Sequence, residues 1–218
     1  MFDIVKLGGS LLSDACWPRR FESWLASRSR RRVLLIVGGG EMIEAMRQLD
    51  AVHSLDASAM HWRCVRMLGH TADIAAELLG RETAVTLSRL TTLQEIAALV
   101  CRWQEPDDAG GPPQVAIADV DAFYRPDFAS PHELRPDPSA EDRSPPGLVA
   151  TPTVGWQTTT DAIAVFAAAQ FGATECVLLK SCRVDQFRDL DHAAAAGVID
   201  PEAARLAVDG RKVSLVQL

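Results

Sequence analysis

Residues 4–12 read IVKLGGSLL and residues 33–41 read VLLIVGGGE, and each stretch is a short apolar run followed by consecutive glycines. Runs of this kind suit strands that are buried on both faces. Glycines directly after a buried strand let the backbone turn tightly and present N–H groups to an anion. The two stretches therefore predict buried strands, each followed by a loop that could hold a phosphate or a carboxylate, although a plain turn would also explain the glycines.

The alternation of apolar runs with helical spacing continues along the chain and predicts an α/β fold around a mostly parallel sheet. The second glycine loop does not match the dinucleotide-binding pattern GxGxxG, and the chain contains no GxxxxGK[ST] phosphate loop. Strands are predicted at 4–7, 33–37, 84–87, 115–118, 176–179 and 213–216, and helices at about 17–29, 41–49, 56–79, 92–103 and 159–171, with an alanine-rich helical piece at 189–207.

One proline-rich region interrupts this alternation, because ten of the twelve prolines fall between residues 106 and 152. Proline removes a backbone donor and biases the preceding residue away from helix. We expect a loop or flap at about 124–147 within a single domain that covers residues 1–218. A linker between two domains is the alternative, but the pieces on either side are each too short for a full sheet.

The charge balance is acidic, with 22 basic and 29 acidic residues in a chain of 218 and a net charge of −7. This balance argues against a broad nucleic-acid face. The only basic cluster, Arg28 with Arg30, Arg31 and Arg32, is short and is interpreted as a solvated helix end.

The chain shows no signal for a membrane or for a metal centre. It has no apolar stretch of about 18 residues and no signal-peptide pattern at its start, so a cytoplasmic protein is predicted. The five cysteines are dispersed and never spaced as CxxC, a pattern that argues against structural zinc and against a disulfide framework.

Lysine is rare, since only Lys6, Lys180 and Lys212 stand among the 22 basic residues. Lys6 and Lys180 both lie at the carboxyl ends of predicted strands, where open α/β sheets bind ligands. Two such lysines beside glycine loops point to a polyphosphate whose negative charge grows during transfer and is neutralised from both sides. An exposed lysine at a turn remains the simpler explanation for either one alone.

A run of hydroxyl residues opens the helix predicted at 159–171, in the stretch GWQTTTDAIA at 155–164. Thr158 or Thr159 could serve as the N-cap, with Asp161 in the first turn favoured by the helix dipole. Capping alone would explain these residues. The same geometry would also hold a carboxylate at the ligand edge of the sheet, where it could orient lysines.

Together, the motifs VKLGGSLL at 5–12, IVGGG at 36–40, WQTTTDAIA at 156–164 and LLKS at 178–181 resemble the amino acid kinase family, the group of aspartate, glutamate, acetylglutamate and uridylate kinases. Within it, the short chain, Met60-His61-Trp62 and the LLKS motif resemble the small furanyl-methyl phosphate kinase branch of methanofuran biosynthesis. The stretch SCRVDQF at 181–187 departs from the family pattern of Asp-Gly followed by an aromatic, which leaves the adenine pocket undefined.

The resemblance implies a three-layer αβα sandwich that binds MgATP at one end of the sheet and a small anionic acceptor at the other, in a homodimer or larger homo-oligomer. Mg would be carried with ATP, with no protein metal ligand. His61 would reach the acceptor phosphate, although a core-boundary histidine is the alternative. Matched to the family motifs, the catalytic residues would be Lys6, Asp161 and Lys180; the ATP-phosphate residues Gly8, Gly9, Ser10, Ser181 and Asp185; and the acceptor residues Gly38, Gly39, Gly40, His61, Thr158 and Thr159.

The activity implied is ATP-dependent phosphorylation of a small molecule, and a phosphate monoester is favoured as the acceptor. A carboxylate kinase of the glutamate, acetylglutamate or aspartate type, which forms an acyl phosphate, is the second reading. A non-catalytic nucleotide-binding module of the same fold is the third.

Overall fold

The computed structural model describes residues 1–105, 112–125, 150–207 and 212–218. Its six strands form one parallel sheet in the order β3-β4-β2-β1-β5-β6. Most of the proline-rich segment predicted at about 124–147 lies outside the described residues. The strands are β1 (Asp3–Leu7), β2 (Arg32–Val37), β3 (Thr86–Leu90), β4 (Gln114–Ala118), β5 (Glu175–Lys180) and β6 (Lys212–Gln217).

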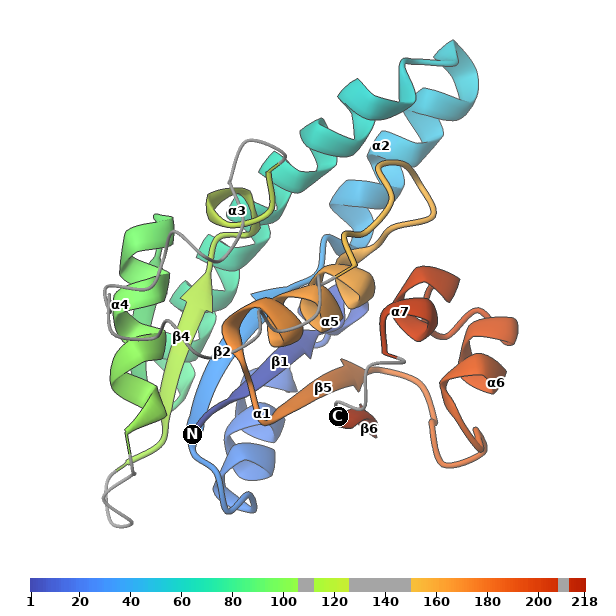
Figure 1. Cartoon of the computed structure of the whole chain (residues 1–218). Helices are drawn as coiled ribbons and strands as arrows, with labels where there is room; N and C mark the ends of the chain where they lie inside the picture. Colours follow the sequence, from blue (N-terminus) through green and yellow to red (C-terminus); the bar gives the residue numbers. More distant parts are fainter. Residues whose placement is uncertain (106–111, 126–149, 208–211) are drawn as a thin grey trace, which may run out of the picture.

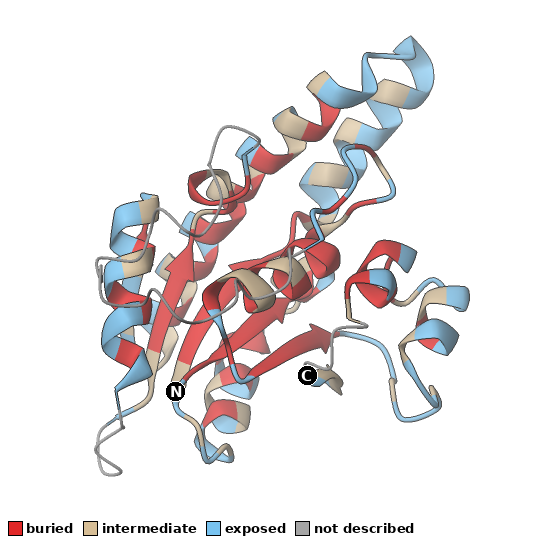
Figure 2. Cartoon of the chain, in the orientation of Figure 1, coloured by how far each residue is buried: buried red, intermediate tan, exposed pale blue. Residues whose placement is uncertain are grey.

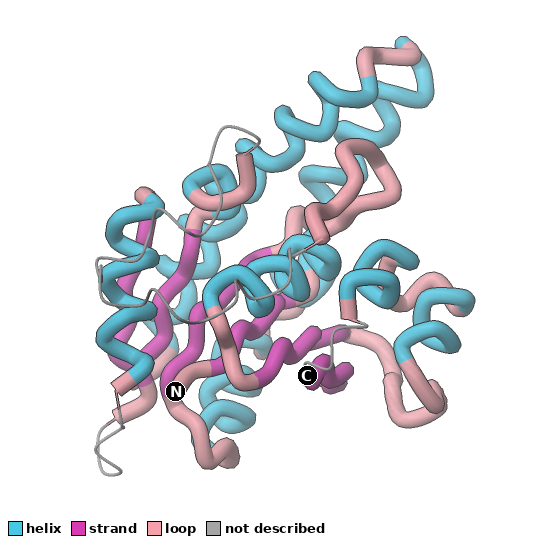
Figure 3. Tube along the Cα trace, viewed as in Figure 1, coloured by secondary structure: helices cyan, strands magenta, loops and turns pink. Residues whose placement is uncertain are grey.

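Helices cover both faces of this sheet, so the predicted three-layer α/β sandwich is confirmed (Figures 1 and 3). The α-helices are α1 (Trp17–Ala26), α2 (Gly40–His53), α3 (Ala57–Glu82), α4 (Leu93–Gln104), α5 (Thr160–Phe171), α6 (Leu190–Ala195) and α7 (Pro201–Leu206), and two 3-10 helices are η1 (Gly9–Ser13) and η2 (Val120–Ala122).

All six predicted strands are present. The helix predicted at 17–29 ends at Ala26 and the one predicted at 41–49 runs to His53, and two further predictions also differ from the structure. β3 begins at Thr86, not at residue 84, because this edge strand alternates exposed and covered residues and is not a continuous apolar run. The alanine-rich piece at 189–207 is two short helices, not one. Gly197 separates them with φ +72°, a left-handed conformation that favours glycine, and Pro201 begins the second.

The core divides into two layers because side chains alternate between the faces of each strand. Ile4, Leu34 and Leu178 face one side, where they pack with α4 and α5. Val5 and Leu35 face the other side, where they pack with α1 and the second half of α3. The four inner strands β1, β2, β4 and β5 are almost entirely buried (Figure 2), whereas the edge strands β3 and β6 are only partly covered.

The order of the strands places a ligand edge at β1. β2 pairs with one side of β1 and β5 with the other, and in open α/β sheets ligands bind outside the carboxyl ends of strands at such a switch point. Lys6 on β1 lies opposite Leu178 on β5, and Lys180 follows two residues later. Lys6 and Lys180 therefore project from the same face of the sheet, toward α5.

The basic cluster at residues 28–32 was predicted to be a solvated helix end, and this prediction is wrong for two of its arginines. Arg28 and Arg30 belong to an ionic network at the amino ends of β1 and β5, the end of the sheet opposite Lys6 and Lys180. The Arg28 guanidinium lies 2.9 Å from Asp3 and 2.6 Å from Glu175, and Arg30 lies 2.7 and 2.9 Å from the same two carboxylates. Asp3 is fully buried and Glu175 is 2% exposed. The arginines neutralise acidic groups that strand pairing buries.

Candidate active site

Asp161 joins the two lysines predicted to be catalytic. One carboxylate oxygen lies 2.9 Å from the Lys6 Nζ, and the other accepts a hydrogen bond of 2.6 Å from the Lys180 Nζ. All three residues are buried, with exposed fractions of 6% for Lys6, 3% for Asp161 and 8% for Lys180. One carboxylate thus holds two ammonium groups near the carboxyl ends of the neighbouring strands β1 and β5.

The first turn of α5 fixes the position of Asp161. Thr159 is the N-cap, and its hydroxyl accepts a hydrogen bond from the Asp161 backbone N–H, as predicted for either Thr158 or Thr159. The Thr158 hydroxyl instead donates to the carbonyl of Thr153. The capping role and the placement of a carboxylate beside the lysines are therefore both realised in one turn.

The electrostatics of this trio favour charged side chains despite their burial. Burial opposes ionisation of Asp161, but the charges of Lys6 and Lys180 outweigh it and hold the pKa of Asp161 below its usual value. Burial and the nearby Lys6 charge lower the pKa of Lys180, although Asp161 and Asp200 attract its proton. The site carries concentrated positive charge that an anionic group could neutralise.

The two glycine loops pack backbone against backbone. A Cβ atom on Gly9 would lie 2.1 Å from the backbone nitrogen of Gly40, and one on Gly38 would lie 2.7 Å from the nitrogen of Gly9. Gly40 also has φ +53°, in the left-handed region. Glycine is required here by the close approach of the loops as well as by any ligand.

Not every glycine amide in these loops is available to an anion. The Gly8 N–H donates to the Leu179 carbonyl at 3.0 Å, and the Gly38 N–H donates to the Leu7 carbonyl at 2.9 Å. Gly9 begins η1 and Gly40 begins α2, and the first N–H groups of a helix have no partner within that helix. Amides from these later positions are the ones placed to bind an anion.

A cavity of about 220 Å³ opens beside Lys6, between the glycine loops and the first halves of α2 and α3. One face of α2 and one face of α3 form its walls, each with the spacing i, i+3, i+4, i+7. The wall residues are Gly40, Ile43, Glu44 and Arg47 of α2, and His61, Cys64, Val65 and Leu68 of α3.

The structure brings eight of the fourteen predicted site residues to this cavity. They are Lys6, Gly9, Ser10, Gly39, Gly40, His61, Thr158 and Thr159. Asp161 and Lys180 join the site through their contacts with Lys6 and with each other.

Two other predicted ATP-phosphate residues, Ser181 and Asp185, are exposed residues that follow β5. The Ser181 hydroxyl is 2.8 Å from the Ser10 hydroxyl, which links the segment after β5 to the loop after β1. Asp185 forms an ion pair of 2.8 Å with Arg183, which lowers the pKa of its carboxyl group. Within the part of the chain that the structure describes, Asp185 forms no ion pair or hydrogen bond with Lys6 or Lys180.

His61 lines the cavity and is 6% exposed. Its Nδ1 lies 3.2 Å from both the nitrogen and the carbonyl oxygen of Gly155, and its Nε2 is buried with no hydrogen-bond partner among the described residues. Burial lowers the pKa of His61, and the Gly155 contact opposes this only in part. The ring packs edge-on against Trp62 and Tyr124. A neutral imidazole with a free nitrogen therefore borders the cavity.

Sequence reasoning missed Glu44, Arg47 and Trp156 at the mouth of the cavity. Arg47 lies over the Trp156 ring, 4.6 Å from its centroid, and Trp156 donates to Asp50 at 2.5 Å. The helical spacing of residues 40, 43, 44 and 47 was a usable signal, because those positions share one helix face. Trp156 opens the motif WQTTTDAIA, but its contacts with α2 arise only through the fold.

Comparison with known proteins gives the fold a class. No protein-family model matches the chain. Across 99–100% of its length it is similar to the UMP kinase of Ureaplasma parvum (TM-score 0.61, 12% identity, 90% of that chain) and to that of Bacillus anthracis (TM-score 0.62, 11% identity, 86% of that chain). The aspartate kinase of Synechocystis gives a TM-score of 0.60 at 11% identity, over 100% of this chain and 38% of that one. The chain has the fold of the amino acid kinases, as its motifs predicted.

A curated relative is similar to part of the sequence. The [5-(aminomethyl)furan-3-yl]methyl phosphate kinase of Methanocaldococcus jannaschii is 27% identical over 100 residues, which are 44% of this chain and 46% of the relative. The match thus spans about half the length of that relative, and it falls in the branch that the motifs resembled.

Two further findings concern what the described part of the chain contains. No described helix is long and apolar enough to cross a membrane. The described residues hold no cluster of three or more His, Cys, Asp or Glu side chains suited to a metal ion. The five cysteines are all free.

Proposed function

We propose that the protein is an ATP-dependent kinase that transfers a phosphoryl group to a small phosphate monoester of the furanyl-methyl phosphate type. The observation that carries this proposal is the buried bridge of Asp161 between Lys6 and Lys180, at the carboxyl ends of the central strands and beside a small cavity. A carboxylate that holds two ammonium groups in place suits a reaction in which negative charge must be stabilised.

In this reaction an oxygen of the acceptor phosphate forms a bond to the γ-phosphorus of ATP, and the bond from that phosphorus to the β,γ-bridging oxygen breaks to release ADP. Charge spreads over the equatorial oxygens of the transferred group. Lys6 and Lys180 would contact these oxygens and the leaving oxygen, and Asp161 would keep both ammonium groups in position. A phosphate acceptor is already an anion, so positioning and charge stabilisation suffice without a general base.

The donors of the site fit the phosphates of ATP. Two of these donors are the ammonium groups of Lys6 in β1 and Lys180 in β5. The others come from the segments that follow these strands and are the backbone of Gly9 and the hydroxyls of Ser10 and Ser181, which would hold the phosphates. A magnesium ion carried with the nucleotide would supply further neutralisation of phosphate charge. Asp185 stays part of the proposal for this side of the site, through its position after Ser181.

The cavity supports a phosphate monoester as the acceptor. The unpaired Nε2 of His61, the N-terminus of α2 at Gly39 and Gly40, and the segment of Thr158 and Thr159 converge on it. Neutral and backbone donors together with Lys6 can bind a dianion. The partial match to a phosphate kinase favours the same class.

The first experiment measures ADP release by the purified protein with MgATP against a panel of acceptors. The panel contains an aminomethylfuranyl-methyl phosphate, isopentenyl phosphate, UMP, acetylglutamate, glutamate and aspartate. Turnover with one phosphate monoester supports the proposal. Turnover with a carboxylate, trapped by hydroxylamine as an acyl phosphate, would replace it with the carboxylate-kinase reading. ATP binding without turnover would favour a nucleotide-binding module.

The second experiment replaces the lysines one at a time. Lys6→Arg and Lys180→Arg are each expected to lower kcat by about 100-fold or more while the protein stays folded, because a planar guanidinium cannot replace a compact ammonium in a buried pair. Lys212→Arg is the matched control, since Lys212 is an exposed lysine that pairs with Glu175 at the other edge of the sheet. Retained turnover in either of the first two variants would remove that lysine from the mechanism.

Homodimer or higher assembly and a cytoplasmic location are further parts of the proposal, and both rest on the resemblance to the family. Light scattering of the purified protein measures the assembly state directly. A monomer at working concentrations would contradict that part of the proposal without affecting the reaction.

A further inference from the structure

Asp200 lies at the N-terminus of α7 and contacts two helices at once. One carboxylate oxygen accepts from the Ala203 N–H at 2.5 Å and so caps α7. The other accepts from the N–H of Thr159 at 2.9 Å and from its hydroxyl at 2.5 Å. Asp200 is 8% exposed. It therefore binds the N-cap residue of α5, whose hydroxyl in turn holds the Asp161 backbone.

The same segment also reaches Lys180. The carbonyl oxygen of Val198, two residues before Asp200, accepts a hydrogen bond of 2.7 Å from the Lys180 Nζ. Lys180 is thus held from two sides, by Asp161 of α5 and by the Val198 carbonyl. Among the described residues, the Lys180 ammonium donates hydrogen bonds to Asp161 and to the Val198 carbonyl.

We propose that Asp200 is a positioning residue for phosphoryl transfer, which acts by fixing the first turn of α5 and the Val198 carbonyl so that Asp161 and Lys180 keep their geometry. This inference rests on the proposed kinase function. It assigns a role to the segment between α6 and α7, which no motif of the sequence identified. Asp200 itself contacts other protein groups, so it is not a catalytic residue in this proposal.

Charge gives the proposal a second consequence. The Lys180 ammonium faces Lys6 from β1, Asp161 from α5 and Asp200 from the segment before α7. The negative charge of Asp200 raises the pKa of Lys180, against the lowering effect of burial and of Lys6. Loss of that charge would lower the pKa of Lys180 further.

The test variant is Asp200→Asn, and its matched control is Asp189→Asn. Asparagine caps helices about as well as aspartate, so the cap of α7 is kept, whereas one acceptor oxygen of Asp200 becomes an amide nitrogen that cannot accept from Thr159. Asp189 is the exposed N-cap of α6, a helix of the same length, and accepts from the His192 N–H at 2.7 Å. It has no contact with the lysine pair in the described structure.

Kinetics and a direct titration read out the result. Asp200→Asn is expected to lower kcat by about 10-fold or more with little change in the KM of ATP, because misplacement of catalytic groups affects the transition state most. With lysine labelled at 13Cε, the chain gives three signals, from Lys6, Lys180 and Lys212. The titration midpoint of the Lys180 signal should fall in Asp200→Asn and stay unchanged in Asp189→Asn, with Lys212 as internal reference.

The outcomes separate this inference from the proposed function. If the wild type turns over an acceptor, and Asp200→Asn has the same kcat and the same Lys180 titration midpoint as Asp189→Asn, the role of Asp200 is overturned. The proposed kinase function is not affected by that result. A wild type that turns over no acceptor would overturn the kinase, and the inference with it. If Asp200→Asn does not fold, Thr159→Val removes the hydroxyl donor from the other side of the same contact. A kcat of Thr159→Val equal to that of the wild type would also overturn the inference.

Discussion

At the scale of single residues, Asp161 shows why a buried charge is kept in this fold. A carboxylate taken out of water costs several kcal/mol unless it is paired, and Asp161 has two cationic partners within 3 Å. Two ammonium groups and one carboxylate leave one net positive charge in a buried site. The arrangement is costly as a stabilising device, which is a further reason to interpret it as a site for an anionic ligand.

His61 yields a prediction at this scale. His61→Ala is expected to raise the KM of the phosphate acceptor by about 10-fold with little change in the KM of ATP, because it removes one hydrogen-bond donor to a charged group. Steady-state kinetics with each substrate varied in turn measure both constants. His70→Ala, an exposed histidine on the same helix, is the control. Equal acceptor KM values in the two variants would contradict a contact between His61 and the acceptor.

At the scale of elements, the glycine loops after β1 and β2 act as one unit, and Gly9→Ala tests it. The new Cβ would lie 2.1 Å from a backbone atom of Gly40, so the loops must separate. We expect a loss of about 2 kcal/mol in the free energy of unfolding and weaker substrate binding.

Gly80→Ala provides the control for this change. Gly80 lies within α3, and a Cβ there would meet a Leu87 side-chain carbon only at 3.9 Å. Alanine favours a helix interior over glycine by about 0.5–1 kcal/mol, so this variant should be slightly stabilised. Chemical denaturation compares the two. Similar stabilities would show that the loops do not depend on each other's glycines.

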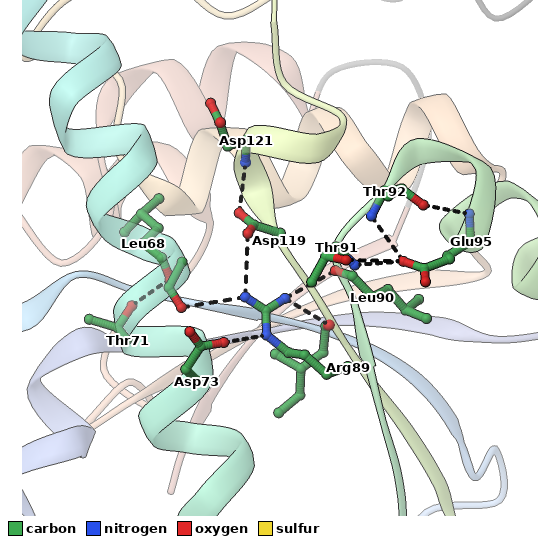
Figure 4. A network of polar contacts seen from close by, with 12 residues as sticks. Leu68, Thr71, Asp73, Arg89, Leu90, Thr91, Thr92, Glu95, Asp119 and Asp121 are labelled. Atoms are coloured by element: carbon green, nitrogen blue, oxygen red, sulfur yellow. Dashed lines mark hydrogen bonds and ion pairs between the residues drawn. The ribbon is translucent and has the colours of Figure 1, made fainter.

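Arg89 fastens α3 to the carboxyl end of β3 and β4 (Figure 4). Its guanidinium lies 2.9 Å from Asp73 and 3.4 Å from Asp119, and it donates to the Gly69 carbonyl, one residue beyond the cavity wall residue Leu68. The contact fixes α3 at the point where its lining of the cavity ends.

Arg89→Leu is therefore expected to lower the free energy of unfolding by about 2 kcal/mol, since several charge-assisted hydrogen bonds of a half-buried group are lost. Denaturant unfolding measures the change. Arg81→Leu is the control, because its i,i+4 pair with Glu77 is exposed on both sides and surface pairs contribute about 0.5 kcal/mol or less. A change for Arg89 no larger than that for Arg81 would contradict the fastening role.

At the scale of the whole molecule, the active edge and the opposite edge of the sheet both depend on buried acids. At the opposite edge, burial opposes ionisation of Glu175, but hydrogen bonds from Ser214, Arg28 and Lys212 outweigh it and lower its pKa to about 2. The ionic network thus joins the segment between α1 and β2 to β1, β5 and β6 and ties the sheet together at the end away from the cavity.

Acid stability follows from this shift. A folded-state pKa below the unfolded value contributes stability above the unfolded pKa, which is lost as pH falls toward about 2, the pKa of folded Glu175. Wild type should lose stability steeply between about pH 4.5 and 2, and Glu175→Gln should show a shallower loss. Thermal unfolding across this range tests the difference, with exposed Glu77→Gln as control. Parallel curves for wild type and Glu175→Gln would contradict the role of the network.

Much of the fold could be predicted because its determinants are local. The central strands are apolar runs such as Val33–Val37 that periodicity reveals, and Lys6, Lys180 and Asp161 lie within short motifs that follow strands or open a helix. The bounds of the edge strand β3 were predicted incorrectly because one of its faces is exposed, so polar and apolar residues alternate along it in place of a continuous apolar run. The arginines of the ionic network were misjudged because burial of Asp3 and Glu175 is decided by strand pairing.

The sequence by itself determined that this chain alternates strands and helices, that it carries two lysines at strand ends, and that a carboxylate opens α5. These features depend on residue type and spacing along the chain. Only the tertiary structure decided that both lysines share one carboxylate, that the α2 and α3 faces enclose a cavity with His61, and that Asp200 supports the site from α7. Those contacts join residues that are far apart in the sequence, such as Lys6 and Asp161 at 155 positions and Thr159 and Asp200 at 41 positions. They are set by strand order and helix packing, which no local pattern encodes.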